Sequence, residues 1–117
     1  MISLREVIEK LEAEPLTSNQ SLDRQVNGGY ASDLLSWVIK AARKDMIWVT
    51  LQSHPNVVAV ASLLGLAGVI ITEGIRPDHE TLSKAENEGV VLMTTDKTTF
   101  TVVGELTSLG VKGEMTT

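Results

Sequence analysis

The alternation of apolar runs with helical stretches constrains this chain more than any other feature of its sequence. Four short runs suit β-strands, and three of them consist largely of Val, Ile, Leu and Met. Repeating strand–helix units predict a parallel sheet with right-handed crossovers and helices on its faces. We therefore expect an α/β chain with a three-layer α/β/α fold and a mainly parallel sheet. Its strands are predicted at residues 22–27, 46–51, 67–72 and 90–93.

Helix start and stop signals predict five helices around these strands. Ser3 and Glu6 form a capping-box pattern, and Gly89 is typical of the left-handed residue that closes a helix. The β-branched run at residues 57–60 also suits a strand, but Pro55 before it and a strand directly after it favour a helix. The expected helices run from Ser3 to before Pro15, from near Ser32 to Arg43 and Lys44, from Pro55 to about Leu64, from Pro77 and Asp78 to Gly89, and from Asp96 or Thr98 to near Gly110, with residues 112–117 frayed.

Three of these helices carry apolar residues at helical spacing, which predicts that those residues face the core. In the first helix the repeating residues are Leu4, Val7, Ile8 and Leu11. The chain has only four aromatic residues, so its core is expected to consist of Val, Ile, Leu and Ala. The predicted core stripes are Leu34, Leu35, Val38, Ile39 and Ala42 in the second helix, and Phe100, Val103 and Leu106 in the last.

Length and composition exclude several classes of function. The 117 residues are expected to form a single domain spanning residues 1–117. The net charge is −5 and no basic stripe stands out, so nucleic-acid binding is not expected. Cysteine is absent, which excludes disulfides, thiolate metal sites and cysteine nucleophiles. We find no signal-peptide pattern, and the most apolar region, residues 57–71, is too short to span a bilayer, so a cytoplasmic protein without a membrane partner is expected.

Small polar residues follow each predicted strand and mark a candidate site. The carboxyl ends of parallel strands share one edge, where open α/β sheets bind ligands, and the amides of helix N-termini favour an anionic group there. The loop 27–29, with Gly28 and Gly29, is one such loop, although it matches neither a dinucleotide fingerprint nor a phosphate loop. The candidate ligand-binding residues are Ser53, His54, Asn56, Thr72, Glu73, Gly74, Thr94, Thr95 and Asp96.

Simpler roles compete with ligand binding at these loops. Helix capping alone would select residues such as Ser32, Asp78 and Thr98. His54, at a helix entrance, can act as a base, a ligand or a cap, whereas His79 is expected in a solvated first helical turn. The two histidines lack the spacing of a metal site, so neither a metal nor a cofactor is expected.

The order and spacing of three segments resemble the DRTGG domain family. They are residues 29–36, residues 48–56 and residues 71–74, and Thr94, Thr95 and Asp96 followed by Thr99 and Phe100 fit the threonine-rich turn of that family. The resemblance implies a fold similar to the N-terminal domains of HPr kinase/phosphorylase and of the MurF ligase. It also implies a regulatory or dimer-forming role, with adenine nucleotides as ligands and no kinase chemistry.

The chain departs from both halves of the motif that names the family. The Asp-Arg pair is replaced by the segment 52–56, and the Thr-Gly-Gly reads Thr72, Glu73, Gly74. An arginine that could contact phosphate is therefore missing, although Arg76 lies nearby in sequence, and Glu73 adds a negative charge.

Three functions stay open on the sequence alone. The first is a non-catalytic regulatory domain, a homodimer, that binds a small polar or phosphorylated ligand at the strand-end loops. The second is a protein–protein interaction module or adaptor of a larger complex, with an exposed apolar patch that includes Trp37 or Met46. The third is a minor enzyme that uses His54 with Glu73 or Asp96.

Overall fold

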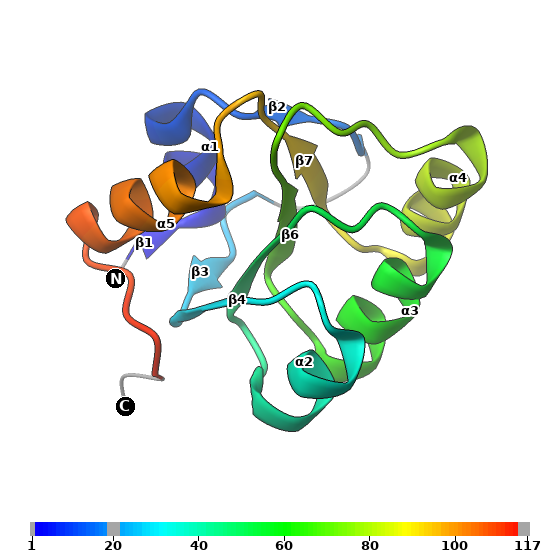
Figure 1. Ribbon diagram of the computed structural model, residues 1–117, viewed down its shortest axis with the longest axis horizontal. Helices are drawn as coiled ribbons and strands as arrows, with labels where there is room; N and C mark the ends of the chain where they lie inside the picture. The colour runs from blue at the N-terminus through cyan, green and yellow to red at the C-terminus, as the bar shows by residue number, and fades with distance from the viewer. Residues whose placement is uncertain (1, 19–21, 115–117) are drawn as a thin grey trace.

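The computed structural model describes residues 2–18 and 22–114, which form a helix-covered sheet and a small separate ladder (Figure 1). The main sheet has five strands in the order β2-β7-β6-β5-β4. Strands β4 to β7 run parallel to one another, and β2 pairs antiparallel with β7. The predicted three-layer fold with a mainly parallel sheet is therefore confirmed.

From β4 onward, strands and helices alternate along the chain as the sequence pattern predicts, whereas β2, β3 and β4 follow one another without a helix between them. Strands β1 and β3 have two residues each and pair antiparallel with each other outside the main sheet. The bounds are β1 Ile2–Ser3, α1 Leu4–Leu11, β2 Glu14–Pro15, β3 Gln25–Val26, β4 Gly29–Ala31, α2 Leu35–Ala41, β5 Ile47–Thr50, α3 Pro55–Leu64, β6 Gly68–Ile71, α4 His79–Glu88, β7 Leu92–Thr94 and α5 Thr99–Ser108.

Each face of the sheet is covered by its own set of helices (Figure 1). Helices α1 and α5 pack on one face, in a cluster that includes Leu4, Val49 and Leu106. Helices α2, α3 and α4 pack on the other face around Trp48 and Val69. Strands β5 and β6 are buried along their whole length, as expected for central parallel strands with two covered faces.

Local capping signals explain most helix boundaries. The side chains of Ser3 and Glu6 form the predicted capping box at α1. Helix α3 begins at Pro55 and ends before Gly65, and α4 ends before Gly89, with both glycines in the left-handed conformation. Residues 57–60 are helical, as predicted.

Several sequence-based boundaries were wrong. Helix α1 ends at Leu11, ahead of Pro15, because Glu12 adopts the left-handed conformation with φ of 54°. Helix α2 begins at Leu35, not near Ser32. Pro15 belongs instead to β2, whose pairing partner β7 lies far away in sequence.

The first predicted strand was also misplaced. Within residues 22–27 only Gln25–Val26 is a strand, and it pairs with β1 outside the main sheet. Gly29 begins the edge strand β4, and it pairs with Ile47 at the start of β5. The loop at residues 27–28 therefore lies at the amino edge of the sheet, opposite the predicted site.

The predicted core stripes hold only in part. Val38, Ala42 and Leu106 are buried, but the side chains of Leu34 and Ile39 are 56% and 46% exposed, and Phe100 is 89% exposed. Their helices each cover only one face of the sheet, so the outer part of each predicted stripe meets solvent. Residues 112–114 form no helix or strand, and the rest of the tail predicted to fray, residues 115–117, lies outside the described residues.

Within the described residues, no helix combines the length and the apolar composition that crossing a membrane would require.

Candidate functional site

Three threonines end the central strands at the carboxyl edge of the sheet. Thr50 and Thr94 are the last residues of β5 and β7, and Thr72 directly follows β6. All three are buried, and their hydroxyl groups already have partners. Thr50 donates to the Asp33 carboxylate at 2.8 Å, the Thr72 and Thr99 hydroxyls share a hydrogen bond of 2.6 Å, and Thr94 donates to the carbonyl of Ile75 at 2.9 Å. These hydroxyls hold the loops in place, so Thr72 and Thr94 support the edge from within.

Backbone hydrogen bonds join the loop after β6 to the loop after β7. The N–H groups of Glu73 and Gly74 donate to the carbonyls of Lys97 and Thr95 at 2.9 and 3.0 Å. The Glu73 carboxylate also accepts a hydrogen bond of 2.8 Å from the Thr99 N–H, at the first turn of α5. A carboxylate of the chain itself thus occupies a helix N-terminus of the kind expected to favour anions.

A polar hollow of about 340 Å³, here called the β7-end pocket, opens beside these loops. Three predicted site residues, Thr94, Thr95 and Asp96, line it. The other lining residues come from the end of α1, from β2, from the loop after β6 and from the loop between β7 and α5: Glu12, Glu14, Arg76 and Lys97. The antiparallel strand β2 forms one wall, which explains why Glu12 and Glu14 were not among the predicted residues.

Arg76 is the exposed cation of this pocket. Its guanidinium donates two hydrogen bonds to the Glu14 carboxylate, at 2.8 and 3.2 Å, and both side chains are more than half exposed. Hydrogen bonding to Arg76 and its positive charge lower the pKa of Glu14. The pKa of Arg76 is raised chiefly by the hydrogen bonds that it donates to the Glu14 carboxylate and by the negative charge of that carboxylate, with a smaller contribution from the charge of Asp96. Arg76 therefore stays charged, and a ligand phosphate would compete with Glu14 for it.

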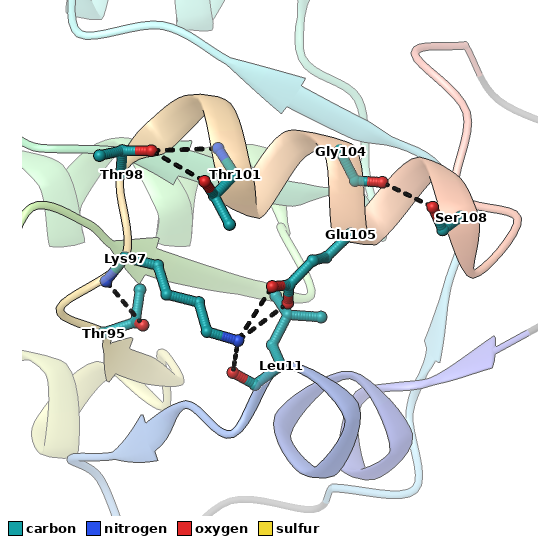
Figure 2. Close-up of polar contacts among 8 residues, drawn as sticks. All are labelled: Leu11, Thr95, Lys97, Thr98, Thr101, Gly104, Glu105 and Ser108. Atoms are coloured by element: carbon teal, nitrogen blue, oxygen red, sulfur yellow. Dashed lines mark hydrogen bonds and ion pairs between the residues drawn. The ribbon is translucent and has the colours of Figure 1, made fainter.

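Lys97 is the second cation, and it ties the pocket to both helices of one face (Figure 2). Its ammonium donates to the Leu11 carbonyl at 2.9 Å and to both carboxylate oxygens of Glu105 at 3.0 Å. The three donors of a lysine are thus all used within the chain. Lys97 holds α1 against α5, and the free hydrogen-bonding capacity of the pocket rests on Arg76.

The predicted residues Ser53, His54 and Asn56 lie apart from this pocket, at the start of α3 on the other face of the sheet (Figure 1). The Nδ1 atom of His54 accepts a hydrogen bond of 3.0 Å from the Asn56 N–H, so His54 caps α3. The Ser53 carbonyl accepts from the Thr81 hydroxyl at 3.0 Å, which joins α3 to the start of α4.

Asp78, which caps α4, lies close to this second group. Hydrogen bonds from the Thr81 N–H and hydroxyl lower the pKa of Asp78, and the charges of His54 and His79 lower it further. Helix capping, the simpler role considered for Asp78 and Thr98, is confirmed for both residues.

The described structure assembles no catalytic constellation around the histidines. Among the described residues, His54 makes no hydrogen bond to the Ser53 hydroxyl or to the carboxylates of Glu73 and Asp96. No group of three or more metal-ligating side chains comes together within residues 2–18 and 22–114. The strand-end candidates thus separate into a β6–β7 group around Arg76 and an α3–α4 group around His54.

These features define a small α/β domain with a solvent-open polar pocket at the carboxyl edge of its sheet. The chain belongs to the DRTGG domain family, whose model matches residues 6–109. The resemblance inferred from the sequence is therefore confirmed.

A solved structure with the same fold is that of the CBS and DRTGG domains of the regulatory region of Clostridium perfringens pyrophosphatase, in complex with the activator diadenosine tetraphosphate. The TM-score is 0.76, with 18% sequence identity over 97% of this chain. The chain spans about half of that structure, 50% of its length. No curated protein sequence matches the chain significantly.

Proposed function

We propose that this chain is a non-catalytic regulatory domain that binds a small polar or phosphorylated ligand at its strand-end loops. The observation that carries the proposal is the β7-end pocket, where Arg76 is exposed beside Thr94, Thr95 and Asp96. Arginine suits phosphate because its planar guanidinium donates two parallel hydrogen bonds. An adenine nucleotide is the first candidate ligand, because the solved relative was crystallised with diadenosine tetraphosphate.

The charges of the pocket limit how tightly a phosphate would bind. Glu12, Glu14 and Asp96 line it together with Arg76 and Lys97. The Glu14 carboxylate accepts two of the five hydrogen bonds that the Arg76 guanidinium can donate, so a phosphate at Arg76 shares the cation with a like charge. We therefore expect modest affinity, suited to a sensor that responds to a changing concentration.

Thermal shift followed by calorimetry tests this proposal with AMP, ADP, ATP and diadenosine tetraphosphate. A ligand at about a hundred times its Kd adds roughly 2.7 kcal/mol to the free energy of unfolding. Arg76→Gln should weaken binding, and Glu14→Gln should strengthen it by releasing the guanidinium. Arg5→Gln is the matched control, because Arg5 also forms one exposed pair, with Asp23 at 3.3 Å.

The results separate the possible arrangements of the site. A fall in affinity with Arg76→Gln but not Arg5→Gln supports the β7-end pocket. A fall with His54→Ala as well would join the α3–α4 group to the same site. No response to any of the four nucleotides would contradict the assignment of nucleotide as ligand.

A protein–protein interaction module is the second candidate function. Leu34, Trp37 and Ile39 are each about half exposed along one short segment around α2, which favours a docking surface. Met46, the other residue predicted for this patch, is buried and does not contribute. The homodimer belongs to the first proposal, the regulatory domain, and sedimentation of the protein and of Trp37→Ser tests whether this surface forms it. The cytoplasmic location stays a prediction from the sequence.

A further inference from the structure

A second hollow, of about 330 Å³, lies away from the strand-end loops, between β4, α5 and the segment after α5. We call it the β4–α5 pocket. Its walls are formed by apolar side chains on the α1–α5 face of the sheet: Ala31, Val49, Val103, Leu106 and Val111. Lys112 and Thr107 also line it. It is unrelated to the β7-end pocket, with which it shares no lining residue.

The small residues of the edge strand explain why this space is not filled. Side chains alternate between the two faces of a strand, so Gly29 and Ala31 share the face covered by α5 while Tyr30 packs on the other face. A Cβ atom on Gly29 would lie 3.2 Å from a Val111 methyl group, so the amino end of β4 is closely packed. Ala31 leaves room at the other end. The hollow is partly open to solvent, and its size and mainly apolar walls are those of a small-ligand pocket.

The edge strand adds hydrogen-bonding groups to this apolar hollow. The Ile47 N–H donates to the Gly28 carbonyl, and the Ser32 N–H donates to the Val49 carbonyl, so alternate residues of β4 pair with β5. The backbone N–H and C=O groups of Gly29 and Ala31 therefore point away from β5, toward the open edge of the sheet. There the Gly29 N–H donates to the Lys112 carbonyl at 2.8 Å. The backbone N–H of Ala31 faces the same edge, above the hollow.

Lys112 gives the β4–α5 pocket a positive charge. The exposed Lys112 side chain forms no ion pair with any residue of the described ranges, whereas Arg76 and Lys97 are both paired with glutamates. The chain as a whole is acidic, with a net charge of −5, and the Lys112 ammonium places a positive charge beside apolar walls. An anionic group on an apolar ligand would thus find a counter-charge and a backbone donor at the mouth.

We propose that the β4–α5 pocket is a binding site for one small amphipathic anion, with an apolar ring or branched body and a single acidic group. The apolar body lies against Ala31, Val103 and Leu106, and the acidic group lies toward Lys112. The volume admits one small molecule and falls at the lower end of the range for ligand pockets. This site goes beyond the proposed function and does not depend on it.

Two related probes test the proposal on the full chain. 8-Anilinonaphthalene-1-sulfonate is an amphipathic anion, and N-phenyl-1-naphthylamine is its uncharged analogue. Amide NMR spectra locate binding and calorimetry measures affinity. The anionic probe should shift the signals of residues 29–31 and 111–113 and leave those of residues 94–96 unchanged.

The variants separate the charge from the apolar walls. Lys112→Gln should weaken the anionic probe about two- to fivefold, the range of an exposed ion pair, and leave the neutral probe unchanged. Thr107→Trp, at an exposed position of α5, should fill the mouth and weaken both probes more than tenfold. Ser83→Trp on α4 is the matched control and should change neither.

Three results would overturn the proposal. The first is amide signal changes confined to α2 or Phe100. The second is that both probes bind with equal affinity to the native chain and to Lys112→Gln. The third is that Thr107→Trp binds both probes as tightly as the native chain. None of these depends on nucleotide binding at Arg76. A negative result for ligand binding at the β4–α5 pocket can therefore be told apart from a negative result for nucleotide binding at the β7-end pocket.

Discussion

The left-handed conformation of Glu73 offers a quantitative test of how this domain departs from its family motif. Glu73 has φ of 65°, where an L-residue costs about 1–2 kcal/mol relative to its favoured conformation. Glycine avoids this cost, but its greater freedom stabilises the unfolded chain by about 0.4–1 kcal/mol relative to alanine, which offsets part of the gain. Glu73→Gly should therefore be more stable than Glu73→Ala by about 1 kcal/mol. Both variants lose the carboxylate bond to the Thr99 N–H, so that loss cancels in the comparison.

Urea denaturation and thermal melting measure the difference. A change of 1 kcal/mol corresponds to roughly 3–6 °C in Tm for a chain of this size. Glu9, exposed inside α1, is the control position, because there the order reverses and alanine should be more stable than glycine by about 1 kcal/mol. If alanine also proves more stable at position 73, backbone strain at Glu73 is not a real feature of the folded chain.

Three further changes have expected outcomes. Trp48→Phe should lower the free energy of unfolding by about 1–3 kcal/mol, because the Ser32 carbonyl then loses the indole N–H that donates to it at 2.9 Å. Urea denaturation measures the change, and an unchanged urea midpoint would contradict it. Asp78→Ala should destabilise the domain at neutral pH, and its difference in stability from the native chain should shrink below about pH 4. The pKa of Asp78 is lower in the folded state, so the stability that Asp78 contributes is present above the unfolded pKa of about 3.9 and is lost as the pH falls through the folded pKa. Melting curves from pH 2 to 7 test this, and a constant difference would refute it. Phe100→Ser should leave Tm within about 2 °C of the native value, because its ring is 89% exposed, and a large loss measured by calorimetry would place the ring in a packed site.

Local sequence decided the features that depend on a few neighbouring residues. The capping box of Ser3 and Glu6 and the start of α3 at Pro55 were predictable because their partners lie within one helical turn. The buried strands β5 and β6 were predictable because a central parallel strand needs apolar residues on both faces. The family motif, through its order and spacing, also predicted the fold.

The tertiary structure alone decided which residues meet at the site. Arg76 meets Glu14 because β2 returns antiparallel beside β7, a pairing of two residues that no local pattern specifies. His54 and Asp96 follow strands of the same sheet, yet their helices cover opposite faces, so the predicted site separates into two groups (Figure 1). The three residues of β4 lie at an edge, where short strands carry little hydrophobic signal because one side meets solvent. The periodicity of apolar residues indicates which side of each helix or strand is buried. The contacts between elements depend on packing between residues far apart in the sequence, and no local sequence pattern specifies it.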